Sequence, residues 1–256
     1  MNTSRDELRA RVLKLRGYLG PFQAAMIELD PEWVERYLAF VCAPNESGRI
    51  SMRLTQLIYV AIDAVPSHLY PKGIGTHAEL ALKLGATPDE LIETLEIASS
   101  LTQLSPATAL PILAEELRAH GTPAPADHNA RTALAEAYRA ISDEPPDWLD
   151  SAADVAANCV APLVEMISHP WKRSALPPKE RAFIALACNA APAVLAVDGI
   201  RRHIREALSL GATGEEIAEV ICLASGIGIH SLAVGAPILT EVLQRLVQPQ
   251  PDEASN

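Results

Sequence analysis

The side chains that could do chemistry gather around two histidines that lie 126 positions apart, His77 and His203. A histidine exchanges its proton near neutral pH, so it can act as a general acid or a general base. The stretch before His77 adds an imidazole, a phenol and an ammonium group, from His68, Tyr70 and Lys72. Such groups could orient a small acid and stabilise charge that develops on it. We therefore expect an acid–base site centred on His77.

The second histidine has different neighbours. Arg201 lies two positions before His203, and the turn further upstream is apolar. Polar residues occur downstream instead, where His230 follows a glycine-containing stretch. We interpret this difference as a functional specialisation of the two copies. His203 and Arg201 are secondary candidates, and His230 would contribute to a composite site with His77. The alternative is structural, because a histidine on an apolar helix often makes a core hydrogen bond and adjacent basic residues often form a solvated face.

Common patterns for metals, phosphates and disulfides are absent from the sequence. No two histidines have the His-x3-His spacing of a zinc site, and neither glycine-rich nucleotide motif occurs. We therefore expect no metal and no cofactor. Four scattered cysteines in apolar contexts are expected to be buried, unreactive thiols; they are Cys42, Cys159, Cys188 and Cys222.

The chain contains an internal repeat. The segment HAELALKLGATPDELIE, which starts at His77, matches HIREALSLGATGEEIAE, which starts at His203, at 9 of 17 positions. The same offset aligns residues before and after these segments, so a duplication accounts for nearly the whole chain. The predicted organisation is a first copy at 1–120, a linker at 121–129, a second copy at 130–247 and a disordered tail at 248–256.

The fold class is predicted to be all-α. Alanine and leucine recur at helical spacing, and the alternation typical of strands is scarce. Gly85 and Gly211 are placed to end helices, and Thr87 and Thr213 each precede a glutamate by three positions, as in a capping box. The sequence thus predicts the same succession of helices in both copies.

Charge and hydropathy exclude several classes of partner. The 21 basic and 32 acidic residues give a formal net charge of −11, whereas binding to nucleic acid or to an anionic membrane needs clustered cations. The apolar stretch 217–239 carries a glutamate, a histidine and a proline, so we interpret it as a core or interface helix rather than a membrane span. The charged first residues do not resemble a signal peptide, and a cytoplasmic location is expected.

The repeated element H-x3-A-x3-G-A-T-x2-E-[IL]-x-E resembles the carboxymuconolactone decarboxylase superfamily, which includes the AhpD-like alkylhydroperoxidases. This resemblance implies an AhpD-like helical bundle in which two tandem copies form an internal pseudo-dimer. It also implies that three chains assemble into a homotrimer with pseudo-hexameric packing.

The sequence departs from the peroxidase branch of that superfamily, in which two cysteines of a Cys-x-x-Cys-x3-His motif react with the peroxide and an upstream glutamate relays a proton. The aligned histidines are His77 and His203. No cysteine stands at either cysteine position of either copy, and a dithiol is needed to resolve the oxidised thiol. The cysteine positions hold Tyr70, Gly73, Ala196 and Gly199, and the glutamate position falls near Gln56 and Ala182.

The decarboxylase branch needs no cysteine, metal or organic cofactor, and the resemblance implies that a histidine serves as its general acid. Our main hypothesis is therefore a cofactor-free lyase that acts on a small carboxylated lactone or a related enolisable acid, with Gln56 as a further binding residue. Two alternatives stay open. One is a hydroperoxidase that uses a single thiol such as Cys188, and the other is a helical scaffold without catalytic activity.

Overall fold

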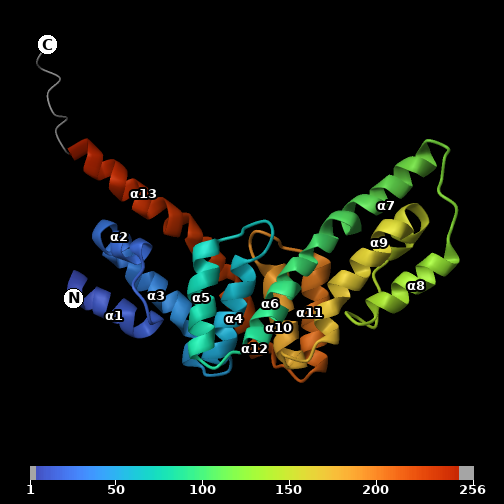
Figure 1. Cartoon of the computed structure of the whole chain (residues 1–256). Helices are drawn as coiled ribbons and strands as arrows, with labels where there is room; N and C mark the ends of the chain where they lie inside the picture. Colours follow the sequence, from blue (N-terminus) through green and yellow to red (C-terminus); the bar gives the residue numbers. More distant parts are fainter. Residues whose placement is uncertain (1–3, 248–256) are drawn as a thin grey trace, which may run out of the picture. The chain divides into compact units, whose positions relative to one another are not determined.

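The computed structural model describes residues 4–247, and every regular element in that part of the chain is helical. The all-α expectation is confirmed, and the tail predicted at 248–256 lies outside the described residues. Figure 1 shows the helices in chain order. Their bounds are α1 (Arg5–Arg16), α2 (Pro21–Leu29), α3 (Pro31–Glu46), α4 (Met52–Asp63), α5 (Pro71–Lys83), α6 (Pro88–Ser99), η1 (Ser100–Gln103), α7 (Leu104–Ala119), α8 (His128–Tyr138), α9 (Trp148–Lys172), α10 (Pro178–Ala190), α11 (Val197–Ser209), α12 (Gly214–Ser225), η2 (Gly226–Ile229) and α13 (His230–Val247).

Local sequence explains where the helices of the repeated element begin and end. Gly85 and Gly211, which follow α5 and α11, have φ angles of +92° and +80°, a conformation that glycine adopts without strain. At the start of α6 the Thr87 hydroxyl accepts the N–H of Glu90, and the Glu90 carboxylate accepts the N–H of Thr87. Thr213 begins α12 with the same reciprocal pair. The predicted caps are therefore confirmed.

Two parts of the chain have the same order of helices. Met52 begins α4 and Pro178 begins α10, 126 positions later. The same spacing separates the starts of α5 and α11, of α6 and α12, and of α7 and α13. The helices therefore follow the offset that the sequence repeat indicates.

The chain forms two compact units that differ from the two predicted copies. One unit combines the described residues up to Ser47 with those from Gly226 onward, and the other is Gly48–Ser225. Within the second unit α7 packs along α9, and within the first unit α13 packs along α2 (Figure 1). Helix α7 of the first half of the sequence thus packs against α9 of the second half, and α13 of the second half packs against α2 of the first half. The compact units therefore combine residues from both copies of the repeat.

The linker predicted at 121–129 is shorter in the structure. Helix α8 begins at His128, because the Asp127 carboxylate accepts the N–H of Ala130 and caps the helix. Proline and polar residues surround this segment, and for that reason its sequence predicts a linker.

Helices α4 and α10 form the centre of the second unit. Every residue from Leu54 to Asp63 in α4 and from Arg181 to Asn189 in α10 is buried. The two helices contact each other, and α6 and α12 each pack against both of them. Polar side chains on α4 therefore lie in the interior, where their environment is set by the neighbouring helices.

A buried ion pair joins α6 to α10 within this centre. The Glu93 carboxylate is fully buried, and its Oε1 accepts a hydrogen bond of 2.8 Å from Nε of Arg181. Its Oε2 accepts the backbone N–H groups of Ala175 and Leu176, at 3.0 and 3.2 Å. Arg181 also donates to the carbonyl oxygens of Arg173 and Leu176. Both charges are thus compensated by hydrogen bonds inside the protein.

The first unit has its own core. Leu8 and Val12 of α1, Ile27 of α2 and Leu38 of α3 are fully buried, and Ala236 of α13 completes the cluster. Helix α13 thus contributes an apolar strip to a core that α1, α2 and α3 begin.

The apolar stretch near the C-terminus includes α12, η2 and α13. Residues Gly214–Leu246 are long and apolar enough to cross a membrane by length and composition, with a mean hydropathy of 1.8. A single stretch of this kind is weak evidence, so this property alone does not indicate a membrane protein.

Helices α7 and α13 expose the same apolar pair. Ile112 and Leu113 of α7 are 55% and 43% exposed, and Ile238 and Leu239, at the matching positions of α13, are 55% and 49% exposed. Exposed apolar surface that recurs at equivalent positions favours contact with further copies of the chain. The homotrimer stays a prediction, and these faces are the ones on which we test it.

We expect Ile112→Asp together with Ile238→Asp to dissociate the assembly, because two carboxylates would lose their hydration at the contact. Light scattering should give about three times 27.4 kDa for the wild-type chain and a lower mass for the double variant. The exposed change Leu82→Asp on α5 is the control. A wild-type mass of 27.4 kDa at all concentrations would contradict the trimer.

We expect Glu93→Gln to lower the free energy of unfolding by about 3–5 kcal/mol, because Arg181 would keep a buried charge without its partner. Urea denaturation followed by circular dichroism measures this loss. The control is Glu79→Gln, which breaks the exposed pair with Lys83 and should cost far less. Equal losses in the two variants would mean that the buried pair has no special role.

Candidate functional site

The main candidate site lies where α4 ends and α5 begins. The chain reverses direction between them, and the N–H of Tyr70 donates to the carbonyl oxygen of Asp63 at 2.8 Å. Leu69 takes a φ of +43° in this turn, and Pro71 begins α5, where a missing N–H costs no helical hydrogen bond. The turn thereby holds the polar residues before His77 against the end of α4.

His77 is buried between α5 and α4. Its Nδ1 lies 2.7 Å from Oε1 of Gln56, and its ring centroid lies 4.8 Å from that of Tyr59. Because an amide oxygen only accepts hydrogen bonds, Nδ1 of His77 is the donor in this contact. The structure thus brings together His77 and Gln56, two residues that the sequence selected, and orients the imidazole ring.

Asp63 is a candidate that the sequence analysis missed. It is the last residue of α4 and is 1% exposed. Burial raises the pKa of this carboxyl to about 8, so it holds its proton at neutral pH. A Cβ at Gly73 would lie 2.0 Å from Oδ2 of Asp63. The repeat contained a signal for this contact, because Gly73 and Gly199 match and face matching polar residues, Asp63 and Asn189.

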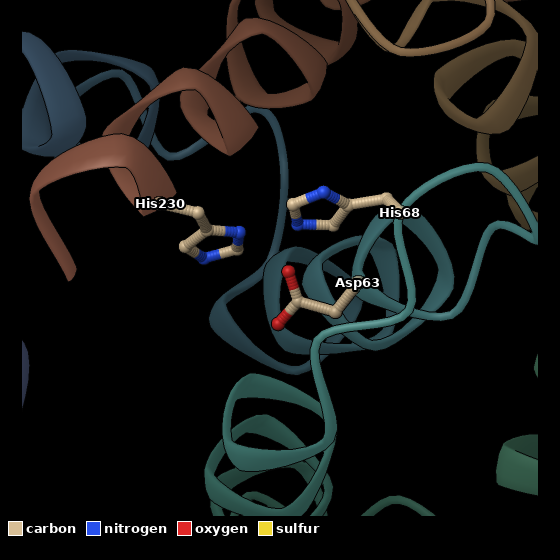
Figure 2. Close-up of side chains that lie close together, drawn as sticks. All are labelled: Asp63, His68 and His230. Carbon is tan, nitrogen blue, oxygen red and sulfur yellow. The ribbon is translucent and has the colours of Figure 1, made fainter. Parts of the chain in front are cut away.

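His68 lies beside Asp63. Figure 2 shows the imidazole and the carboxyl group close together at the end of α4, and a ring nitrogen of His68 lies within 4.8 Å of a carboxyl oxygen. Burial lowers the pKa of His68, which favours the neutral imidazole. The ring of Tyr70 is 6.2 Å from that of His68. A protonated acid and a neutral base therefore stand next to each other.

Two further sequence candidates are exposed. Lys72 lies in the first turn of α5, and Arg201 lies in the first turns of α11. His230, which is also labelled in Figure 2, begins α13 in the first unit, and its part in a composite site stays a prediction.

His203 has a different environment from His77. It is 1% exposed, its Nδ1 lies 2.7 Å from Oε2 of Glu206, and its ring stacks on Trp171 at 6.0 Å. Burial lowers the pKa of His203, and the Glu206 carboxylate only partly opposes this effect. The imidazole is therefore neutral, and its Nδ1 donates to the carboxylate.

The positions that carry Gln56 and Asp63 near His77 hold other residues near His203. Ala182 stands where α4 has Gln56, and Asn189 stands where α4 has Asp63. Asn189 donates to the carbonyl oxygen of Ala185 at 2.8 Å and cannot carry an acidic proton. Of the two segments, only the one around His77 combines an imidazole, an amide and a buried acid.

The cysteines differ from the expectation that all are buried. Cys42 and Cys188 are buried, whereas Cys159 on α9 and Cys222 on α12 are exposed. The expectation was wrong for these two because each lies on the outer face of an otherwise apolar helix. Burial raises the pKa of Cys188 to about 12, so its thiol is protonated and a poor nucleophile at neutral pH.

We expect an aromatic disulfide reagent to label Cys159 and Cys222 in the native protein, because a thiol must be exposed to react. Cys188 should react only at the rate of unfolding. Mass spectrometry of digested samples at successive times identifies each labelled thiol, and Cys188→Ser is the control that should leave the fast labelling unchanged. Fast labelling of Cys188 would revive the single-thiol alternative.

Comparisons with known proteins agree with this architecture. Residues 31–116 match the model of the carboxymuconolactone decarboxylase family. A crystal structure from Burkholderia xenovorans LB400, described as that of a "putative gamma-carboxymuconolactone decarboxylase subunit", is 32% identical in sequence, with a TM-score of 0.89. The match covers 94% of this chain and 98% of that chain. A search of curated proteins gives no match.

Proposed function

The chain belongs to the carboxymuconolactone decarboxylase family, and from this premise we propose that it is a lyase that removes CO2 from a small carboxylated lactone or a related enolisable acid. The proposal needs no cofactor, because the reaction only requires that the electron pair left by CO2 be stabilised and then protonated at carbon. Both tasks suit acidic and hydrogen-bonding side chains.

The observation that carries this proposal is the buried carboxyl group of Asp63, which lies against Gly73 and beside His68. A carboxyl group with a pKa of about 8 is a general acid at neutral pH, and its partner His68 is a neutral base. Sites of proton transfer commonly raise the pKa of an acid and lower the pKa of a neighbouring base.

In the proposed reaction, the C–C bond to the carboxylate breaks and its electron pair enters the conjugated system as an enolate. A proton from Asp63 or His77 then forms the new C–H bond. A hydrogen-bond donor such as Tyr70 would hold the remaining carboxylate. Half-buried His68 would return a proton from solvent to Asp63, so that each turnover consumes one proton and releases one CO2.

We expect Asp63→Asn to lower the catalytic rate by roughly 10²–10⁴, the range for loss of a general acid. The fold should persist, because Asn189 occupies the matching position beside Gly199. Release of CO2 from γ-carboxymuconolactone measures the rate. His77→Gln should cause a loss in the same range, and His203→Gln a smaller one. Glu79→Gln, an exposed change on α5, is the control. Full activity in both Asp63→Asn and His77→Gln would favour the scaffold alternative.

The pH dependence of stability provides a second test. The Asp63 pKa rises from 3.8 to about 8 in the folded state, so the folded chain binds one more proton than the unfolded chain between these values. Stability relative to Asp63→Asn should therefore fall as pH rises from about 4 to 8, and level off above that range. Urea midpoints of both proteins across this range measure the difference. Parallel curves would mean that Asp63 is ionised in the folded protein.

A further inference from the structure

A hollow of about 620 Å³ lies beside α11 in the second unit. One wall is the stretch from Arg139 to Pro146 after α8, and the other is the outer face of α11 from Asp198 to Ser209. This volume is within the usual range for small-molecule sites. The lining includes four arginines, which are Arg139, Arg201, Arg202 and Arg205.

Arg202 is the arginine that the surrounding structure orients. Its Nη1 donates to the hydroxyl oxygen of Tyr138 at 2.7 Å, and its guanidinium lies 5.7 Å from the centre of the Tyr138 ring. Its Nη2 lies 3.5 Å from Nε2 of His203. The Nε–H is buried and has no hydrogen-bond partner. Among the described residues, no carboxylate forms an ion pair with this guanidinium.

Tyr138 and His203 contact the guanidinium of Arg202, and each of them is oriented by a further hydrogen bond. Glu206 accepts the Nδ1 proton of His203, which leaves the Nε2 lone pair for Nη2 of Arg202. The hydroxyl of Tyr138 donates to Oε1 of Gln103 at 2.8 Å, so its oxygen is available to accept from Arg202. Glu206 is thus hydrogen-bonded to His203, and Arg202, which lines the hollow, has no carboxylate partner among the described residues.

We propose that this hollow binds a small carboxylate, with the Arg202 guanidinium as the group that holds it. A planar carboxylate matches the fork of donors on arginine, and each Nη of Arg202 has a second N–H beyond the one directed at Tyr138 or His203. The site is separate from the proposed lyase chemistry, because none of the residues that line it comes from α4 or α5.

The acidic residues of the hollow limit the size and charge of the ligand. Four carboxylates line the hollow: Asp143, Glu144 and Asp198 are exposed, and Glu206 is hydrogen-bonded to His203. Glu144 also contacts Arg205 at 3.6 Å. These carboxylates would repel a polyphosphate but would tolerate one or two carboxylate groups near Arg202. The proposed ligand is therefore a small mono- or dicarboxylate rather than a nucleotide.

Succinate is a suitable probe, with inorganic phosphate and uncharged succinamide as comparisons, all at constant ionic strength. Isothermal titration calorimetry on the full chain should show saturable binding of succinate and none of succinamide. Arg202→Gln should weaken succinate binding by roughly 10- to 100-fold, the usual effect of losing hydrogen bonds to a charged group. Arg202→Lys should bind with intermediate affinity, because it keeps the charge but loses the fork. Arg118→Gln, an exposed change on α7, is the matched control and should bind as the wild type does.

Hydrogen exchange on the wild-type chain keeps the proposal testable if Arg202→Gln does not fold. Succinate should slow exchange in the two walls, residues 139–146 and 198–209. Asp63→Asn should bind succinate normally even if it loses lyase activity, which separates this site from the proposed active site. Equal binding by wild type and Arg202→Gln, protection outside the two walls, or binding of phosphate but not succinate would each overturn the proposal.

Discussion

The fold depends on a buried ion pair between the two halves of the sequence, formed by Glu93 of α6 and Arg181 of α10. Each partner also makes backbone hydrogen bonds near the start of α10, so both charges are satisfied without water. The cost of removing two charges from water offsets much of their attraction. The pair therefore acts mainly by fixing how α10 approaches α6, because a shifted arrangement would leave a buried charge unpaired. That approach also determines what packs around α4.

The segment around His77 and the segment around His203 have the same backbone arrangement but carry different polar side chains. Gly73 and Gly199 both make room for the side chain at the end of the preceding helix, which is Asp63 in one segment and Asn189 in the other. Aspartate and asparagine have nearly the same shape, but only aspartate gains a transferable proton when burial raises its pKa. Together with Gln56 in place of Ala182, this difference gives the segment around His77 a buried acid that the segment around His203 lacks.

The matching histidines, His77 and His203, show that neighbouring residues determine the hydrogen bonds that a histidine makes. His77 donates to the neutral amide of Gln56 beside the buried acid. His203 donates to the carboxylate of Glu206 and presents its other nitrogen to Arg202. Our two proposals follow from this contrast. Proton transfer is assigned to the first segment, and recognition of an anion to the second.

The sequence by itself determined the helical class, the caps at Thr87 and Thr213 and the offset between matching helices, because these depend on residues a few positions apart and on comparison of the chain with itself. It also selected His77 and Gln56. Only the tertiary structure decided that Asp63 is buried, that α7 and α13 pack across the repeat boundary, and that Arg202 lines a hollow. The physical reason is that burial and pKa depend on which distant segments pack around a group, and no local pattern encodes those contacts.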